Sequence, residues 1–275
     1  MHTYLGVPSS PVVPRDAFTF FLLSPFFRAK KKKGVSQQFY SAMKPLALLA
    51  LGAAVAEAHY IFNILIVNGK RIGGEYDYFR RNSNSYNPAF PEIVTTNDLR
   101  CNKGAKPGTT KTYDVKAGDK IGFKLFNNEM IEHPGPGFVY MSMAPNGTNV
   151  KDYDGSGDWF KAYEVGLCGK NPGSDGNWCS YQKDRLEFTI PPKTPPGEYL
   201  VRVEHIGLHE GHKNRAQFYI ECTQLRISGE GGGTPNPLVK IPGIYKDQDP
   251  GIHYDKWVSK PAAYVMPGPA LWDGN

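Results

Sequence analysis

The chain has few cysteines, no extended apolar run and no sustained helical periodicity. Four cysteines occur among 275 residues, and no pair has the Cys-x-x-Cys spacing of a typical zinc site. The apolar cluster at residues 18–27 is interrupted by Pro25, and it is shorter than the roughly 20 residues that a membrane-spanning helix needs. The absence of 3.6-residue periodicity argues against a helical bundle. No internal repeat occurs.

The chain also has almost no net charge once its first 58 residues are set aside. The formal net charge of the whole chain is +6. Seven of the 32 Lys and Arg residues and two of the 26 Asp and Glu residues lie in residues 1–58, which leaves 25 against 24 for residues 59–275. A basic surface for nucleic acid or for an anionic membrane is therefore not indicated, and we expect neither as a partner.

Residues 43–58 have the pattern of a secretory signal peptide. Lys44 provides a basic start, residues 46–56 form an apolar run, and two alanines at the end fit an Ala-x-Ala cleavage site. Cleavage after Ala58 would make His59 the N-terminal residue of a secreted, extracellular protein. An N-terminal histidine offers a free amine and an imidazole, so one residue can bind a metal ion twice.

The signal peptide divides the chain into three parts. We interpret residues 1–42 as an extension of the gene model upstream of the true start at Met43, and a disordered leader is the alternative. Residues 59–275 are long enough for one domain with a sizeable core. No serine-rich linker or cysteine-rich module follows, so we expect a single domain without an appended carbohydrate-binding module.

Short alternating segments, separated by glycine and proline, recur along residues 59–275. They are residues 60–67, 112–115, 120–127, 138–144, 186–190, 198–205 and 216–227. Such strands between turn signals predict an all-β fold, an antiparallel β-sandwich of the immunoglobulin-like or fibronectin III-like type. The strand-poor stretches 70–100, 150–180 and 229–275 carry many aromatic residues, so we expect long ordered loops.

The cysteines and one asparagine fit an oxidising, secretory environment. An even number of cysteines after a signal peptide indicates two disulfides. Of the three possible pairings we favour Cys101–Cys222, which closes a long loop, and Cys168–Cys179, which closes a short one. Asn146 begins an Asn-Gly-Thr sequon in a turn-like stretch, which predicts a glycosylation site.

Residues 204–212 contain three histidines. Their spacing resembles a helical zinc-protease motif, but His-Glu-x-x-His requires a helix with histidines four apart, and the glycines and strand pattern disfavour one. Read as a strand, the segment places His205 and His209 on one face. We interpret His205 and His212 as surface residues.

Two further segments carry polar groups in a defined setting. His133 lies in a loop of prolines and glycines just before a predicted strand. In residues 216–222, alternation places Gln217, Tyr219 and Glu221 on one face and the apolar side chains on the other. A phenol and an amide would then project together, away from the apolar face.

Together these segments resemble the fungal copper-dependent lytic polysaccharide monooxygenases of auxiliary activity family nine. The matching residues are His59, His133, Leu208-His209 and the Ala-Gln-Phe-Tyr run 216–219, with Cys222 just beyond. The C-terminal segments 239–245, 249–252 and 264–271 also resemble the family. The resemblance covers residues 59–271.

The resemblance implies one copper ion in the mature chain. His59 would supply its amine and a ring nitrogen, His133 a third nitrogen, and Tyr219 a distant axial oxygen. Nitrogen ligands in a tetragonal arrangement suit copper(II). His209 and Gln217 would act as catalytic helpers that donate hydrogen bonds beside the metal.

The activity implied by the resemblance is oxidative cleavage of β-1,4-glucan chains of cellulose at C1 and/or C4, with hydrogen peroxide or dioxygen. The electron donor would be cellobiose dehydrogenase or a small reductant, and we expect a monomer. Tyr264 and Tyr78 would contact the glucan on a flat active face. The alternatives are a non-catalytic carbohydrate- or copper-binding β-sandwich, and a glycoside hydrolase, for which the sequence offers no evident carboxylate pair.

Overall fold

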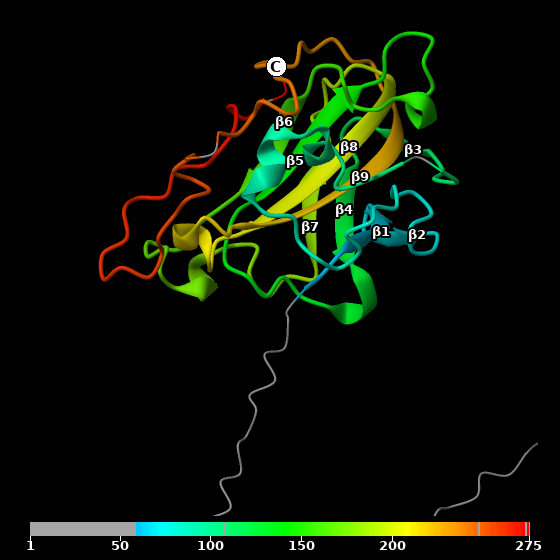
Figure 1. Ribbon diagram of the computed structural model, residues 1–275. Helices are drawn as coiled ribbons and strands as arrows, with labels where there is room; N and C mark the ends of the chain where they lie inside the picture. Colours follow the sequence, from blue (N-terminus) through cyan, green and yellow to red (C-terminus); the bar gives the residue numbers. More distant parts are fainter. Residues whose placement is uncertain (1–58, 107, 247, 273, 275) are drawn as a thin grey trace, which may run out of the picture. The chain divides into compact units, whose positions relative to one another are not determined.

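The computed structural model describes residues 59–106, 108–246, 248–272 and 274, which form two β-sheets packed face to face (Figure 1). The predicted extension 1–42 and signal peptide 43–58 lie outside the described residues. An antiparallel β-sandwich was predicted, and the fold confirms that prediction.

The smaller sheet has four antiparallel strands in the order β2-β1-β4-β7. They are β1 (Phe62–Val67), β2 (Lys70–Ile72), β4 (Lys120–Leu125) and β7 (Arg185–Thr189). Asn68 and Gly69 form the two-residue turn between β1 and β2, with φ of 49° and 77°. Positive φ at both turn positions matches the twist of a hairpin, and Asn-Gly is the pair that adopts it most readily.

The larger sheet has five strands in the order β3-β9-β8-β5-β6. They are β3 (Tyr113–Lys116), β5 (Gly137–Met143), β6 (Phe160–Val165), β8 (Gly197–Gly207) and β9 (Gln217–Ser228). Only β3 departs from antiparallel pairing, because it runs parallel to β9. The long strands β8 and β9 lie side by side across the sheet in Figure 1, and every residue of β8 is paired with a residue of β9.

The helices of the described residues are all short 3₁₀ turns in the loops. They are η1 (Pro91–Thr95), η2 (Asn97–Leu99), η3 (Phe126–Asn128), η4 (Val150–Asp152), η5 (Asp175–Asn177) and η6 (Gly211–Lys213). None of these described helices has the length or apolar character needed to cross a membrane.

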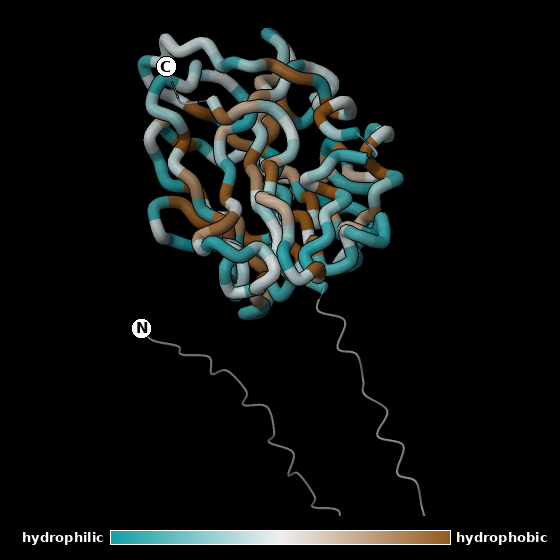
Figure 2. The backbone as a smooth tube through the Cα atoms, turned by 90° about the vertical axis from the view of Figure 1, so that its left-hand side faces the viewer, coloured by the Kyte–Doolittle hydropathy of each residue, from teal (hydrophilic) through white to brown (hydrophobic). Residues whose placement is uncertain are grey.

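Both faces of the larger sheet are buried, which the alternation in residues 216–222 did not predict. Tyr219 faces the core between the sheets, where it is packed with Phe62 and Val203. Phe218 and Ile220 face a second core under the loops and the C-terminal segment. That segment runs along the β6 edge in Figure 1, and Figure 2 shows hydrophobic and hydrophilic stretches alternating along the backbone. The face carrying Gln217 and Tyr219 is therefore interior along β9.

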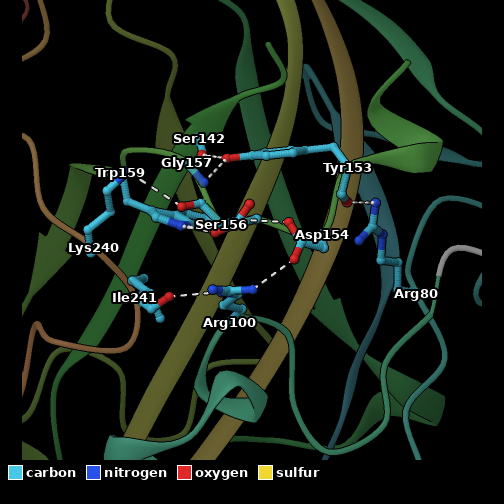
Figure 3. Close-up of polar contacts among 11 residues, drawn as sticks. Arg80, Arg100, Ser142, Tyr153, Asp154, Ser156, Gly157, Trp159, Lys240 and Ile241 are labelled. Carbon is cyan, nitrogen blue, oxygen red and sulfur yellow. Dashed lines mark hydrogen bonds and ion pairs between the residues drawn. The ribbon is translucent and has the colours of Figure 1, made fainter. Parts of the chain in front are cut away.

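Polar contacts hold the strand-poor loop after β5 against the sheet (Figure 3). The Tyr153 hydroxyl lies 2.6 Å from Ser142 Oγ, and the Tyr153 carbonyl accepts a 2.9 Å hydrogen bond from the buried Arg80. Arg100 donates to the carbonyl of Ile241, 2.8 Å away, which ties the C-terminal segment to the same region. These bonds order the loop without a strand pattern.

Two disulfides close the loops around the sheets. Cys101 is joined to Cys222 across 121 residues, and Cys168 is joined to Cys179 across 11 residues. This is the pairing that we favoured from the sequence. On a chain-entropy basis, the long loop would stabilise the fold by about 5 kcal/mol and the short one by about 3 kcal/mol.

Candidate metal centre

Three segments meet at one end of the larger sheet. His59 lies directly before β1, His133 lies in the loop before β5, and β8 and β9 bring their ends together at Gly207 and Gln217. The loop that carries His133 is bonded to β8, because Ile206 of β8 donates to the carbonyl of Pro136 at 3.0 Å. Leu208, the residue after β8, donates to the carbonyl of Pro134 at 2.8 Å. The strand register therefore brings residues from distant parts of the sequence to one place.

Two glycines allow this loop to lie close to β8. A Cβ atom at Gly135 would overlap the carbonyl oxygen of Ile206. A Cβ atom at Gly207 would lie 3.0 Å from Cβ of His133 and 3.5 Å from Nδ1 of His209. Glycine is used where backbones must approach this closely. The two imidazoles can consequently come together over the sheet end.

The aromatic rings of the site form a tight cluster. The rings of His133 and His209 are stacked, with centroids 4.0 Å apart and planes 19° apart. The ring of Tyr219 lies 6.0 Å from that of His133. Tyr60 stacks on Tyr219 with centroids 3.9 Å apart, on the side of the core. The structure thus brings together His133, His209 and Tyr219 as the sequence analysis expected.

Tyr219 and Gln217 are joined by a hydrogen bond. The Tyr219 hydroxyl donates to Oε1 of Gln217 over 2.7 Å. Both side chains are buried, with exposed fractions of 2% and 7%. A hydroxyl that donates its proton in this direction keeps its oxygen lone pairs for another group, such as a metal ion.

His209 is half-buried beside the stacked rings. Burial lowers the pKa of His209, Glu210 raises it, and Lys256 and His59 lower it further. The side chain is therefore neutral at pH 7. Its Nδ1 atom is buried and has no hydrogen-bond partner among the described residues. The segment that begins at His59 reaches this cluster, because the ring of the next residue, Tyr60, lies 5.8 Å from that of His133.

The donor set fits a copper ion better than a multi-ligand zinc site. Within the described residues, no three or more His, Cys, Asp or Glu side chains are grouped to hold a metal ion. Copper bound by two imidazoles and an amine requires only two such side chains, and those predicted from the sequence are His59 and His133. Nitrogen donors of this kind suit copper(II). In the 275-residue chain, the nitrogen of His59 is still a peptide nitrogen.

The interpretation of His205 as a surface residue is wrong. His205 is completely buried and is the cross-strand partner of Tyr219. Burial lowers the pKa of His205 to about 3, so the ring is neutral. The sequence pattern could not reveal this, because the second sheet covers the face that carries His205. His212 is only partly buried.

Comparisons with known proteins identify the family of this chain. The model of Auxiliary Activity family 9 (formerly GH61) matches residues 59–264. The chain belongs to Auxiliary Activity family 9. This match begins at His59, and it confirms the resemblance predicted from the sequence. Members of the family are copper-dependent enzymes that cleave polysaccharides oxidatively with external reductants, and they are generally extracellular.

Several curated relatives and solved structures are similar to this family 9 chain. Lytic polysaccharide monooxygenase G of Aspergillus tamarii is 47% identical over 234 residues, which cover 84% of this chain and 71% of the relative. Monooxygenase A of Aspergillus fumigatus is 44% identical over 243 residues, with 84% and 82% covered. The extended catalytic domain of H. jecorina LPMO9A superposes with a TM-score of 0.69 at 25% identity, with 78% and 92% covered.

The two predicted substrate tyrosines of this family 9 chain are only partly exposed. Tyr78 packs on Tyr113, with ring centroids 5.2 Å apart, and its carbonyl accepts a hydrogen bond from Thr223. Thr223 lies six residues along β9 from Gln217, about 20 Å away. Tyr264 is part-buried, with its ring against Trp178 and its hydroxyl donating to Gly251.

An aromatic residue that the sequence analysis did not nominate lies next to the site. Trp257 is 59% exposed, and its indole nitrogen donates to the carbonyl of His209 over 2.7 Å. The Lys256 ammonium lies 3.8 Å from the centre of its ring. Trp257 was only one of many aromatics in the loops, and no feature of the sequence indicated that it would be exposed beside His209.

Proposed function

We propose that the chain is secreted, cleaved between Ala58 and His59, and active as a monomeric monooxygenase on cellulose, oxidising β-1,4-glucan at C1 and/or C4. The convergence of His133, His209 and the Tyr219–Gln217 pair near the segment that begins at His59 carries this proposal. Cellulose as substrate is supported by the similarity to a cellulose-active polysaccharide monooxygenase from M. thermophila. That structure has a TM-score of 0.65 and 27% identity, with 79% of this chain and all of that chain covered.

In the proposed site, the chain binds one copper ion. His59 contributes its new amine and a ring nitrogen, His133 contributes a ring nitrogen, and Tyr219 offers its oxygen from a greater distance. Bound copper supplies the redox chemistry, in which an external donor provides electrons and hydrogen peroxide or dioxygen provides oxygen. The donor would be cellobiose dehydrogenase or a small reductant.

The neighbouring side chains control protons in this proposal. Tyr219 donates to the amide oxygen of Gln217, which leaves the Gln217 amide nitrogen as the group that can donate to a reactant. His209 is neutral because burial lowers its pKa, so one ring nitrogen carries a proton and the other can accept a hydrogen bond. Both groups can therefore donate hydrogen bonds to an oxygen atom at the site without adding positive charge.

Trp257 would contact the glucan chain. An exposed indole can lie against the apolar face of a sugar ring. Its hydrogen bond to His209 fixes the ring beside the imidazole cluster, and Lys256 holds one part of the ring by cation–π attraction. Asn146 is exposed in its turn, as a glycosylation site would need to be.

The test uses protein collected from the culture medium of a secreting fungal host, with its N-terminus sequenced. Copper-loaded protein should release aldonic acids or C4-oxidised sugars from cellulose in the presence of ascorbate, as detected by mass spectrometry. EDTA should stop the reaction. A matched protein with one extra residue before His59 should be inactive, since its amine is displaced. A first residue other than His59, or no oxidised sugar from any β-glucan, would contradict the proposal.

A further inference from the structure

His205 makes two hydrogen bonds in a place where an apolar residue would be expected. It lies on the inter-sheet face of β8, where Val203 and Val201 precede it in the core. Burying a polar ring is unfavourable unless its polar atoms find partners. Nδ1 of His205 lies 2.7 Å from the Tyr60 hydroxyl, and Nε2 lies 3.3 Å from Oγ of Ser180. Both ring nitrogens are thus used.

The direction of these hydrogen bonds follows from a further bond that Ser180 makes. The Ser180 hydroxyl donates to the carbonyl of Gly135 over 2.6 Å, and a carbonyl can only accept. Ser180 must then accept from Nε2–H of His205. A neutral imidazole that is protonated at Nε2 has Nδ1 as an acceptor, so the Tyr60 hydroxyl donates to it. The four groups form one continuous, directed hydrogen-bond chain.

The two ends of this hydrogen-bond series, Tyr60 and Gly135, lie next to the two expected nitrogen ligands. Tyr60 follows His59 directly, and its ring stacks on Tyr219. Gly135 is two residues after His133, in the loop that packs against β8. The middle of the chain is firmly held, since His205 is paired in β8 with both β5 and β9. Tyr60, His205 and Ser180 are all buried.

We infer that His205 is a positioning residue, which sets the separation between the segment carrying His59 and the loop carrying His133 by bonding Tyr60 on one side and Ser180 on the other. It also holds the Tyr60 ring flat against Tyr219. His205 itself does not bind the metal. This inference rests on the proposed copper site, and it concerns the geometry of that site rather than its existence.

The test measures copper binding and not only activity. His205→Leu removes both hydrogen bonds of the imidazole. Tyr60→Phe removes the bond to Nδ1 but keeps the aromatic ring, and Ser180→Ala removes the bond to Nε2. For His205→Leu we expect copper(II) affinity, measured by calorimetry, to fall about 10–100-fold, as for other groups that orient metal ligands. The electron paramagnetic resonance spectrum of bound copper(II) should change as well. Tyr60→Phe and Ser180→Ala should change both quantities less, in the same direction.

Two variants separate positioning from a general loss of stability. Val201→Ala, on the same face four residues earlier, should lower the unfolding temperature but leave copper affinity and spectrum unchanged. His205→Gln retains one acceptor and one donor, so it should restore part of the affinity. If His205→Leu does not fold, Tyr60→Phe and Ser180→Ala decide the question.

The outcomes for the inference and for the proposed function are distinct. Wild-type affinity and spectrum in His205→Leu, or in both end variants, would overturn the inference while leaving the copper site in place. A secreted wild-type protein that binds no copper tightly would refute the proposed site, and the inference with it.

Discussion

Tyr219→Phe removes a single hydroxyl group from the centre of the site. The phenyl ring keeps its stacking on Tyr60, where the centroids are 3.9 Å apart. The variant loses the hydroxyl that donates a 2.7 Å hydrogen bond to Oε1 of Gln217 and that we propose as a metal contact. It therefore tests the hydrogen bond and the proposed metal contact while the ring is kept.

The size of the effect follows from burial. Gln217 and Tyr219 expose only 7% and 2% of their surface, so water cannot replace the lost donor well. A buried acceptor left without a partner costs about 1–3 kcal/mol. In a domain of this size each kcal/mol lowers the unfolding temperature by roughly 2–4 °C. We expect copper-free Tyr219→Phe to unfold about 2–12 °C below the wild type.

A double-mutant cycle with Gln217→Leu measures the bond itself. The double variant leaves neither partner unsatisfied. Its loss of unfolding free energy should therefore be smaller than the sum of the losses in the two single variants by about 0.5–3 kcal/mol. Unfolding would be followed in EDTA. Tyr199→Phe is the matched control, because that buried hydroxyl donates to the carbonyl of Pro195, far along β8 from the site. Its effect on the unfolding free energy should add to that of Gln217→Leu, and it should not change the spectrum of bound copper. Additivity of Tyr219→Phe and Gln217→Leu within about 0.5 kcal/mol would refute the reasoning.

Three further variants test other parts of the site and core. His133→Ala should retain the fold by circular dichroism but lose tight copper binding in calorimetry and lose glucan oxidation; tight binding would contradict the ligand assignment. Trp257→Ala should weaken adsorption to cellulose several-fold while copper affinity stays unchanged, and unaltered adsorption would remove Trp257 from the substrate surface. Glu221 is buried, and burial raises its pKa well above the usual range, so the folded state holds its proton more tightly than the unfolded state and stability falls as pH rises above about 4.3. Glu221→Gln should therefore flatten the decrease in unfolding temperature between pH 5 and pH 8, and an unchanged slope would show that Glu221 is not its source.

The strand pattern predicted most of the fold. Each predicted segment corresponds to a strand, from β1 through β9, but β2 and β6 were missed. β2 has only three residues, too few for alternation to be visible. β6 contains Lys161, whose ammonium is buried against Glu164 and the Pro267 carbonyl. A lysine in the core is not expected unless its partners are known, so a strand that depends on them could not be recognised.

The site was predicted where it depends on residue type and order, and missed where it depends on exposure. His133, His209, Gln217 and Tyr219 stand in motifs, and the structure brings their side chains together. Tyr264 and Tyr78 are only partly exposed, and their contact with substrate stays a prediction. A tyrosine in a loop can point inward as readily as outward. The position of Trp257 depends on its hydrogen bond to His209, which is 48 residues away in the sequence.

The sequence by itself determined the chemistry available to this protein. It contains a histidine directly after a predicted cleavage site, two further histidines, a phenol with an amide two residues earlier, and segments in which apolar and polar residues alternate. Periodicity shows which residues share a face of a strand, but it does not show what covers that face. Only the tertiary structure decided that both faces of β9 are buried and that His205 lies inside the core beside Tyr219. It also decided that an indole from the C-terminal segment lies beside His209. These features depend on contacts between residues far apart in the chain, and packing of the complete fold creates them.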